Sequence, residues 1–152
     1  MVDIIHRIGI RSSCKEVYKA LSTIQGLSRW WTEEVQGDEK NGGKIEFTFR
    51  SETGDIKGQM VMQVTELTPD KNVRWQCVDG PPEWIGTNIT FDLSQQEDQT
   101  IIIFGHRNWR ESIEFTAHCS MKWAIFLLSL REYVETGKGK PSPQDVKIDN
   151  WN

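Results

Sequence analysis

A run of alternating strand patterns that ends in one long amphipathic helix constrains the fold of this chain most strongly. The helix is predicted over residues 120–136, with Ser120 as its N-cap and Gly137 just past its end, where glycine is favoured. Its apolar residues recur at helical spacing and form one stripe: Trp123, Phe126, Leu127, Leu130 and Val134. Because such a stripe has to be buried, the sheet formed by the preceding strands is expected to cover it.

The strands are predicted from the alternation of apolar and polar residues that is typical of a half-buried sheet. They fall at residues 2–10, 45–50, 57–67, 73–77, 84–93 and 100–107. After the first strand, Ser13 and Glu16 have the spacing of a capping box, which predicts a helix that Gly26 ends and a short helical turn over 27–31. The segments without clear periodicity are assigned mostly to loop: 36–43, 108–119 and the irregular tail 138–152.

This order of elements predicts an α+β protein with a single domain over residues 1–152. The first strand is followed by two short helices, then by a run of about five antiparallel strands, and finally by the long helix. A strongly twisted sheet that curves around one helix leaves space between them unless large side chains fill it. Seven tryptophans in 152 residues therefore indicate either a large aromatic core or an aromatic-lined pocket.

Two of these tryptophans are adjacent, in the stretch SRWWTE at 28–33. Neighbouring residues cannot share one face of a helix, because helical faces repeat at three and four residues. We therefore expect one of Trp30 and Trp31 to pack beneath the first helix and the other to face the mouth of a cavity. The alternative is that both belong to the packed core.

Composition and motifs narrow the class of protein. A net charge of −4 argues against nucleic acid as a partner. No apolar run approaches the ~20 residues of a membrane span and no signal-peptide pattern is present, so a cytoplasmic location is expected. The three cysteines lack zinc-site spacing, and the chain has no HExxH, GxSxG or nucleotide-binding motif, so no metal and no cofactor are expected.

Several short motifs in a fixed order carry a resemblance to a known family. They are VYKAL at 17–21, GL at 26–27, WW at 30–31, GG at 42–43, VRW at 73–75, WIGT at 84–87, TFD at 90–92 and the block 119–137. With them the chain resembles the helix-grip superfamily, which includes the START lipid-transfer domains, the birch-pollen-allergen-like proteins and the polyketide cyclases. Within it, the chain is most similar to the small bacterial proteins grouped with the activators of the ninety-kilodalton heat-shock chaperone's ATPase.

The resemblance implies a curved antiparallel sheet wrapped around the long C-terminal helix, with two short helices after the first strand. It also implies a cavity between sheet and helix, in which most members bind or process apolar small molecules. Pockets of this kind are lined mainly by apolar and aromatic groups. The residues predicted to bind a ligand are Trp30, Trp31, Phe47, Phe49, Trp75, Trp84, Phe104, His106, Trp123 and Phe126.

Two histidines, His6 and His106, lie on apolar faces of predicted strands. The resemblance implies that these two strands, the first and the last, are neighbours, so the imidazoles are candidates for a catalytic acid–base pair near pH 7. The competing interpretation is that each is a hydrogen-bonded residue of the core.

Three functions follow from these observations. The leading one is binding of a small apolar molecule in an aromatic cavity. The second is a cofactor-free enzyme of the cyclase or dehydratase type that uses His6 and His106. The third is a chaperone-associated interaction domain with a filled core and an exposed apolar patch. Both a monomer and a homodimer are compatible with the sequence.

Overall fold

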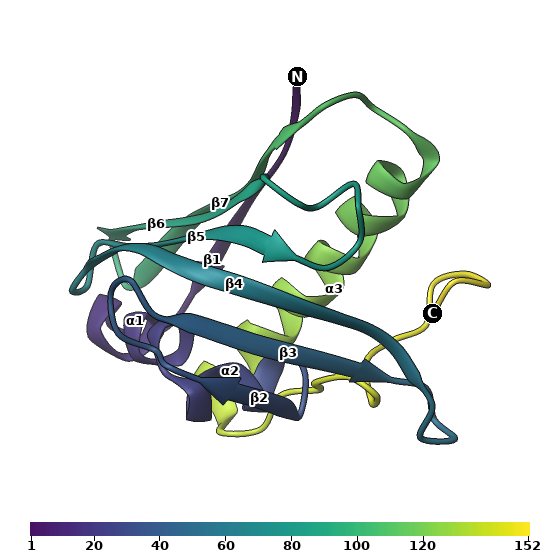
Figure 1. The fold of residues 1–152 in the computed structure, drawn as a ribbon. Coiled ribbons are helices and arrows are strands. Elements are labelled where there is room, and N and C mark those ends of the chain that lie inside the picture. The colour runs from purple at the N-terminus through teal and green to yellow at the C-terminus, as the bar shows by residue number, and fades with distance from the viewer.

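A computed structural model describes residues 1–152 as a seven-stranded antiparallel sheet with three helices (Figure 1). The strands are β1 (Val2–Ile10), β2 (Glu34–Gly37), β3 (Lys44–Arg50), β4 (Ile56–Thr68), β5 (Asn72–Asp79), β6 (Asn88–Gln96) and β7 (Gln99–Trp109). The helices are α1 (Cys14–Ser22), α2 (Ile24–Trp30) and α3 (Glu114–Thr136). The predicted α+β class, with two short helices after the first strand and a long helix at the end, is confirmed.

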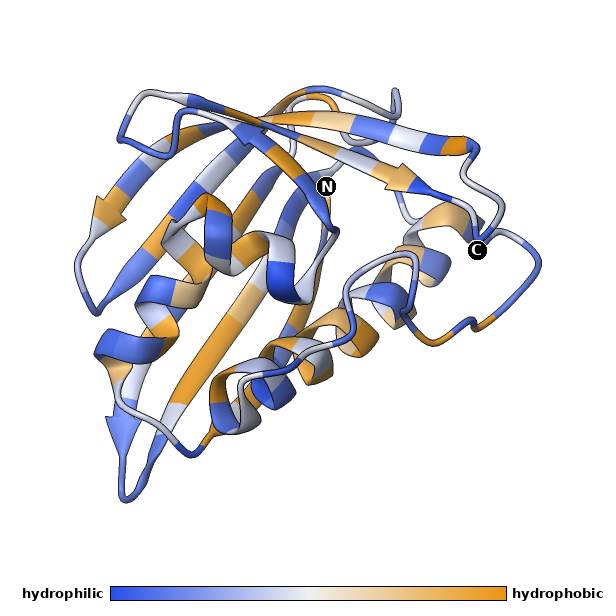
Figure 2. Ribbon diagram, turned by 90° about the horizontal axis from the view of Figure 1, so that it is seen from below, coloured by the Kyte–Doolittle hydropathy of each residue, from blue (hydrophilic) through white to orange (hydrophobic).

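The sheet has the strand order β1-β7-β6-β5-β4-β3-β2, so the first strand of the chain pairs with the last. All three helices lie on the same face of the sheet, which curves around them (Figure 2). None of the helices is both long enough and apolar enough to cross a membrane. The interior is therefore the space between the curved sheet and α3, closed partly by α1 and α2.

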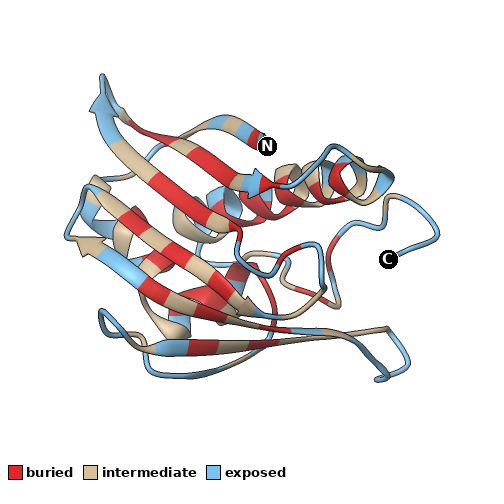
Figure 3. Cartoon of the chain, turned by 45° about the horizontal axis from the view of Figure 1, so that its top comes forward, coloured by how far each residue is buried: buried red, intermediate tan, exposed pale blue.

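Burial alternates along the strands as the sequence pattern predicted (Figure 3). In β5, Val73, Trp75 and Cys77 are almost fully buried, whereas Arg74 and Gln76 between them are only half-buried. Successive side chains of a strand point to opposite faces, so one face of β5 meets the helices and the other meets solvent.

The long helix α3 starts at Glu114, so the assignment of residues 108–119 to loop is wrong. The hydroxyl of Thr116 accepts a hydrogen bond from the backbone N–H of Ile113 at 3.2 Å, which satisfies a donor at the helix start. Ser120 resembles an N-cap in sequence but lies inside the helix. The first turns have few apolar residues on the buried side, and the helical stripe becomes visible only from Cys119 onward.

The first helix also ends at a different residue from the one predicted. It stops at Ser22, and the hydroxyl of Thr23 then caps α2 by accepting from the N–H of Gly26 at 3.0 Å. A Cβ atom on Gly26 would lie 2.6 Å from the carbonyl oxygen of Ala20. Gly26 therefore allows α1 and α2 to approach each other closely and does not terminate a helix.

Two further boundaries in the sheet differ from the prediction. The edge strand β2 is not among the predicted strands, and its last two residues fall in the predicted loop 36–43; the strand is short and mostly exposed. β6 begins at Asn88, so the segment 84–87 forms a turn in which the N–H of Thr87 donates to the carbonyl of Trp84 at 2.9 Å. Gly86 adopts a φ of 89° there, a left-handed conformation that suits glycine and a turn better than a strand.

Candidate functional site

Aromatic rings fill the interior at the end covered by α1 and α2. Phe91 on β6 is central, with ring centroids 5.4 Å from Trp75 and 5.3 Å from Phe104. Phe47 packs on Trp75 at 5.9 Å. The structure therefore places several residues that the sequence predicted for a ligand pocket in a closely packed core: Trp30, Phe47, Trp75 and Phe104. None of these four lines the cavity described below.

The adjacent tryptophans have different surroundings although their rings lie roughly parallel, 6.2 Å apart. Trp30 is fully buried and its indole N–H donates to the carbonyl of Ala20 in α1 at 2.9 Å. Trp31 follows the end of α2 and packs on Trp123 of α3 at 5.0 Å. Trp31 forms part of the wall of a cavity, but it is also buried and packs on Phe47 at 4.4 Å. Both tryptophans therefore belong to the packed core, and a role for Trp31 at the cavity stays a prediction.

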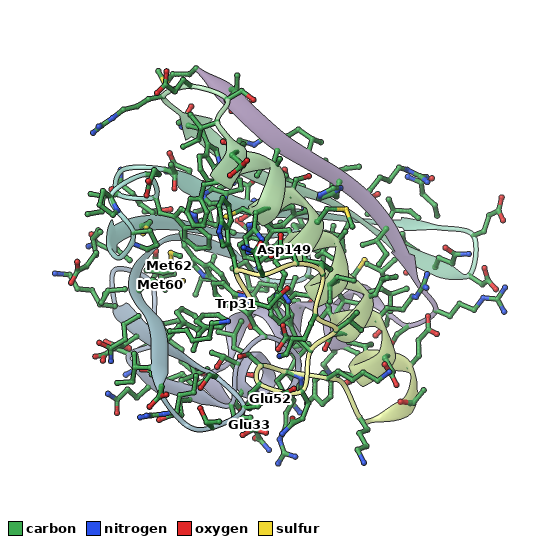
Figure 4. All side chains as sticks on the ribbon, turned by 90° about the vertical axis from the view of Figure 1, so that its right-hand side faces the viewer. Trp31, Glu33, Glu52, Met60, Met62 and Asp149 are labelled. Carbon is green, nitrogen blue, oxygen red and sulfur yellow. The ribbon has the colours of Figure 1, made fainter.

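A cavity of about 190 Å³ lies at the opposite end of the interior, between β3, β4, α3 and the C-terminal segment. Figure 4 faces this end of the molecule and labels Trp31 and Met60 from the cavity wall. Most of the wall is apolar and aromatic: Trp31, Phe49, Met60, Trp84, Phe115, Trp123 and Phe126. Five of the ten predicted ligand residues are thus brought together here: Trp31, Phe49, Trp84, Trp123 and Phe126. Their role in binding stays a prediction.

The C-terminal segment 138–152 forms one side of this cavity, which sequence reasoning missed. Ser142 anchors it beside the adjacent tryptophans, because its N–H donates to the carbonyl of Trp31 at 2.8 Å. The carboxylate of Asp145 is buried and pairs with the ammonium groups of Lys122 and Lys147. The segment has no periodic pattern, so its sequence carries no signal for this position.

The end of the same segment packs on the first turns of α3. The ring of Trp151 lies 5.4 Å from His118 and 6.3 Å from Phe115, centroid to centroid. His118 Nδ1 lies 2.7 Å from a carboxylate oxygen of Asp149, which is labelled in Figure 4. This hydrogen bond holds the pKa of Asp149 below its usual value. The predicted irregular tail is therefore docked on the protein at three points.

His106 is completely buried, with both ring nitrogens in hydrogen bonds. Its Nδ1 accepts from the indole N–H of Trp123 at 3.0 Å, so its proton is on Nε2, which lies 2.8 Å from the hydroxyl oxygen of Thr87. The Thr87 hydroxyl in turn donates to the carbonyl of Trp84 at 2.6 Å. Burial lowers the pKa of His106 to about 3, so the ring is neutral near pH 7.

The predicted pairing of His6 with His106 is not formed. Their strands are neighbours, but the register places Ile4 opposite His106 and Phe104 opposite His6. His6 Nε2 instead lies 3.1 Å from the carbonyl oxygen of Ser120 and its ring stacks on Phe104. Each imidazole is engaged with separate partners, because register offsets the two side chains along the sheet. The geometry therefore does not support an acid–base pair.

The cavity wall also contains one buried donor without an ordinary acceptor. The indole N–H of Trp84 has no oxygen or nitrogen acceptor; it lies beside the thiol of Cys119 and lowers the pKa of that thiol. Burial has the larger effect and raises the pKa of Cys119 to about 12, so the thiol is protonated and a poor nucleophile. The structure contains no group of three or more histidine, cysteine, aspartate or glutamate side chains arranged to hold a metal ion.

Comparisons with known proteins agree with this architecture. Residues 11–135 match the family described as Activator of Hsp90 ATPase homolog 1-like protein. The solution structure of the Aha1 dimer from Colwellia psychrerythraea is 44% identical in sequence, with a TM-score of 0.78, and the match covers 91% of this chain and 100% of that one. No curated protein sequence matches the chain.

More distant structures share the fold alone. CalU16 from Micromonospora echinospora is 20% identical with a TM-score of 0.74, over 97% of this chain and 74% of its own. The AHSA1-like protein from Aeromonas hydrophila is 14% identical with a TM-score of 0.73, over 90% of this chain and 94% of its own.

Proposed function

Because the chain belongs to the family of Activator of Hsp90 ATPase homolog 1-like proteins, we propose that it binds one small apolar molecule in the cavity beneath its C-terminal segment. The observation that carries this proposal is the contrast within one interior. Aromatic rings close one end completely, whereas the same kinds of residue at the other end surround about 190 Å³ of space. Apolar walls with a few polar groups are typical of ligand pockets.

The size of the cavity limits the ligand. An apolar cavity of about 150 Å³ holds benzene, so this one suits a single aromatic ring with a short substituent or a short acyl chain. The buried N–H of Trp84 favours a ligand with an oxygen that accepts a hydrogen bond, because an unpaired buried donor costs free energy. The separated histidines and the protonated thiol of Cys119 favour binding over catalysis.

The seven tryptophans allow a direct test by NMR, since each gives one indole N–H signal. Toluene added to the ¹⁵N-labelled protein should shift the signals of the four tryptophans in the cavity wall saturably: Trp31, Trp84, Trp123 and Trp151. The three outside the wall should move little: Trp30, Trp75 and Trp109. Equal shifts for all seven, or none, would contradict binding in this cavity.

A cavity-filling variant provides the matched control. Gly58 of β4 lines the cavity, and a Cβ atom added there would have nothing within 4 Å. Gly58→Met should therefore occupy the space and abolish the toluene response without unfolding the protein. Gln59→Met, at the adjacent and exposed position of the same strand, should leave the response intact.

A second partner is suggested by the outer face of α3. Met121 and Leu128, seven residues apart, are 54% and 46% exposed there, and the Colwellia relative is described as a dimer. We propose that this face supports a homodimer of the chain.

Sedimentation of the protein and of a Met121→Glu, Leu128→Glu double variant tests the homodimer: the protein should sediment as a dimer and the variant as a monomer. Unchanged sedimentation of the variant would contradict the proposal.

A further inference from the structure

The edge of the cavity has an excess of positive charge, in a chain whose net charge is −4. Three lysines line it, Lys57, Lys122 and Lys147, which we call the lysine cluster. Asp145 is the only carboxylate side chain in the cavity wall, and the carboxylate of Asp149 lies near the lysines as well. Arg50 also reaches the wall, but its guanidinium is paired with Glu34 on the neighbouring strand β2. The lysine cluster with Asp145 and the nearby Asp149 carries three positive charges and two negative charges, a balance of +1.

The ammonium groups of this cluster have donors to spare. Lys122 Nζ donates to the Asp145 carboxylate and to the carbonyl of Val146 at 2.9 Å. Lys147 Nζ donates to the same carboxylate at 3.2 Å and to the carbonyl of Pro143 at 2.8 Å. Each ammonium has three N–H donors, so each of these lysines retains one. The Nζ of Lys57 takes part in no ion pair and no hydrogen bond, so this ammonium group retains all three donors.

The lysines also repel one another. Burial lowers the pKa of Lys57, the charges of Lys147 and Lys122 lower it further, and the carboxylates of Asp145 and Asp149 oppose the effect only in part. Two of the three ammonium groups are held by backbone carbonyls of the C-terminal segment, so they cannot simply move apart. A negative charge placed among them would remove this repulsion and use the unpaired donors.

We propose that the ligand of this cavity is a small monocarboxylate, whose apolar body of about one aromatic ring lies against the tryptophans while its carboxylate binds the lysine cluster. This inference rests on the proposed function and adds the chemical class of the ligand. The apolar wall and the cationic edge are adjacent parts of one cavity, so a single molecule can contact both. The family match ends at residue 135, before Asp145 and Lys147, so two of the charged groups come from a part of this chain outside the matched region.

The test compares three compounds that share an apolar body and differ only in the end group: 3-phenylpropionate, 3-phenylpropanol and 3-phenylpropylamine. Affinities are measured by calorimetry and by the indole N–H shifts. The carboxylate should bind about tenfold more tightly than the alcohol, the scale of one added charge-assisted hydrogen bond, and the amine should bind most weakly. Added salt should weaken binding of the carboxylate and leave the alcohol unchanged.

Lys57→Gln is the most informative variant, because Lys57 has no partner in the folded protein and its loss leaves no buried charge. The variant should bind 3-phenylpropionate about three- to tenfold more weakly and should bind 3-phenylpropanol with unchanged affinity. Lys57→Glu should reduce the preference for the carboxylate over the amine further. Lys71→Gln is the matched control, since Lys71 is exposed in the turn between β4 and β5 and has no side-chain partner.

The possible outcomes separate the two proposals. Equal affinities for carboxylate and alcohol, unaffected by Lys57→Gln, would overturn the carboxylate inference and leave binding of an apolar molecule intact. If none of the three compounds binds or shifts the cavity-wall signals, the proposed function fails and this inference fails with it. If Lys71→Gln reduces the preference for the carboxylate as much as Lys57→Gln does, the preference comes from the overall charge of the protein. That outcome would also overturn the inference.

Discussion

The two ends of the interior are built from the same kinds of residue and differ in what covers them. At the closed end, α1 and α2 cover the interior, the ring of Trp30 packs edge-on against Phe91, and the indole N–H of Trp30 donates to the carbonyl of Ala20. At the open end an irregular segment covers the helix, and the indole N–H of Trp84 is left without an acceptor. Side-chain type therefore does not distinguish core from pocket, whereas the covering element does. An unpaired indole N–H does not distinguish them either, because the buried Trp109 outside the cavity wall has one as well.

The largest expected effect comes from breaking the closed end. Trp30→Ala removes a fully buried ring and leaves the Ala20 carbonyl without its donor, so unfolding free energy should fall by about 3–5 kcal/mol. Trp151→Ala at the open end, where the ring is 44% exposed, should cost less than about 1 kcal/mol. Urea unfolding followed by circular dichroism measures both. Similar losses for the two variants would mean that the ends are not packed differently.

A second prediction concerns His106, whose ring contacts Trp84, Trp109 and Trp123. Its pKa is about 3 in the folded protein and about 6.5 when unfolded. Below pH 6.5 the unfolded chain binds a proton that the folded protein does not, so stability falls as pH falls, by up to about 1.4 kcal/mol per pH unit, until about pH 3.

The unfolded chain of the His106→Gln variant cannot bind this proton, so the variant does not lose that stability in acid. The difference in unfolding free energy between the variant and the unmodified protein should therefore narrow as pH falls from 6.5 toward 4. Urea midpoints at several pH values measure the narrowing. His118→Gln, at a histidine outside the aromatic core, is the control and should not reproduce it. A stability difference that stays constant with pH would show that His106 takes up a proton in the folded protein as readily as in the unfolded chain.

The smallest effect is expected at the tip of the C-terminal segment. Asp149→Asn weakens the exposed contact with His118, so the unfolding midpoint should stay the same while amide hydrogens near Trp151 exchange faster. Hydrogen-exchange mass spectrometry measures this, with Asp98→Asn in the turn between β6 and β7 as the control. Unchanged exchange would indicate that the segment is held mainly by Ser142 and Asp145.

Much of the architecture could be predicted from sequence because it follows from periodicity. The apolar stripe of α3 and the inward face of β5 are where the spacing placed them. The errors occurred where local signals compete, since Ser120 has the composition of a cap and Gly26 that of a terminator. Both residues instead serve contacts between elements: Ser120 with His6 and Gly26 with Ala20. Contacts of that kind have no period along the chain.

The candidate site could be predicted only by residue type. Five of its aromatic side chains were among those expected, but the sequence did not show which tryptophans would enclose space. Nor did the sequence show that the tail lies against α3, although it contains Lys122 in the helix and Asp145 and Lys147 in the tail. Their ion pairs join Lys122 to Asp145, 23 positions apart, and Lys147 to Asp145, two positions apart in an irregular segment, and sequence offers no geometric rule for either.

The sequence by itself determined the fold class, the face of each main element that is buried, and the presence of an excess of large aromatic side chains. Those properties depend on the spacing of residues along the chain, which can be read directly from the sequence. Only the tertiary structure decided that the interior is closed at one end and hollow at the other, and that the two histidines lie apart. Register, the close approach of helices and the path of an aperiodic tail result from packing of the whole chain, and no local pattern encodes them.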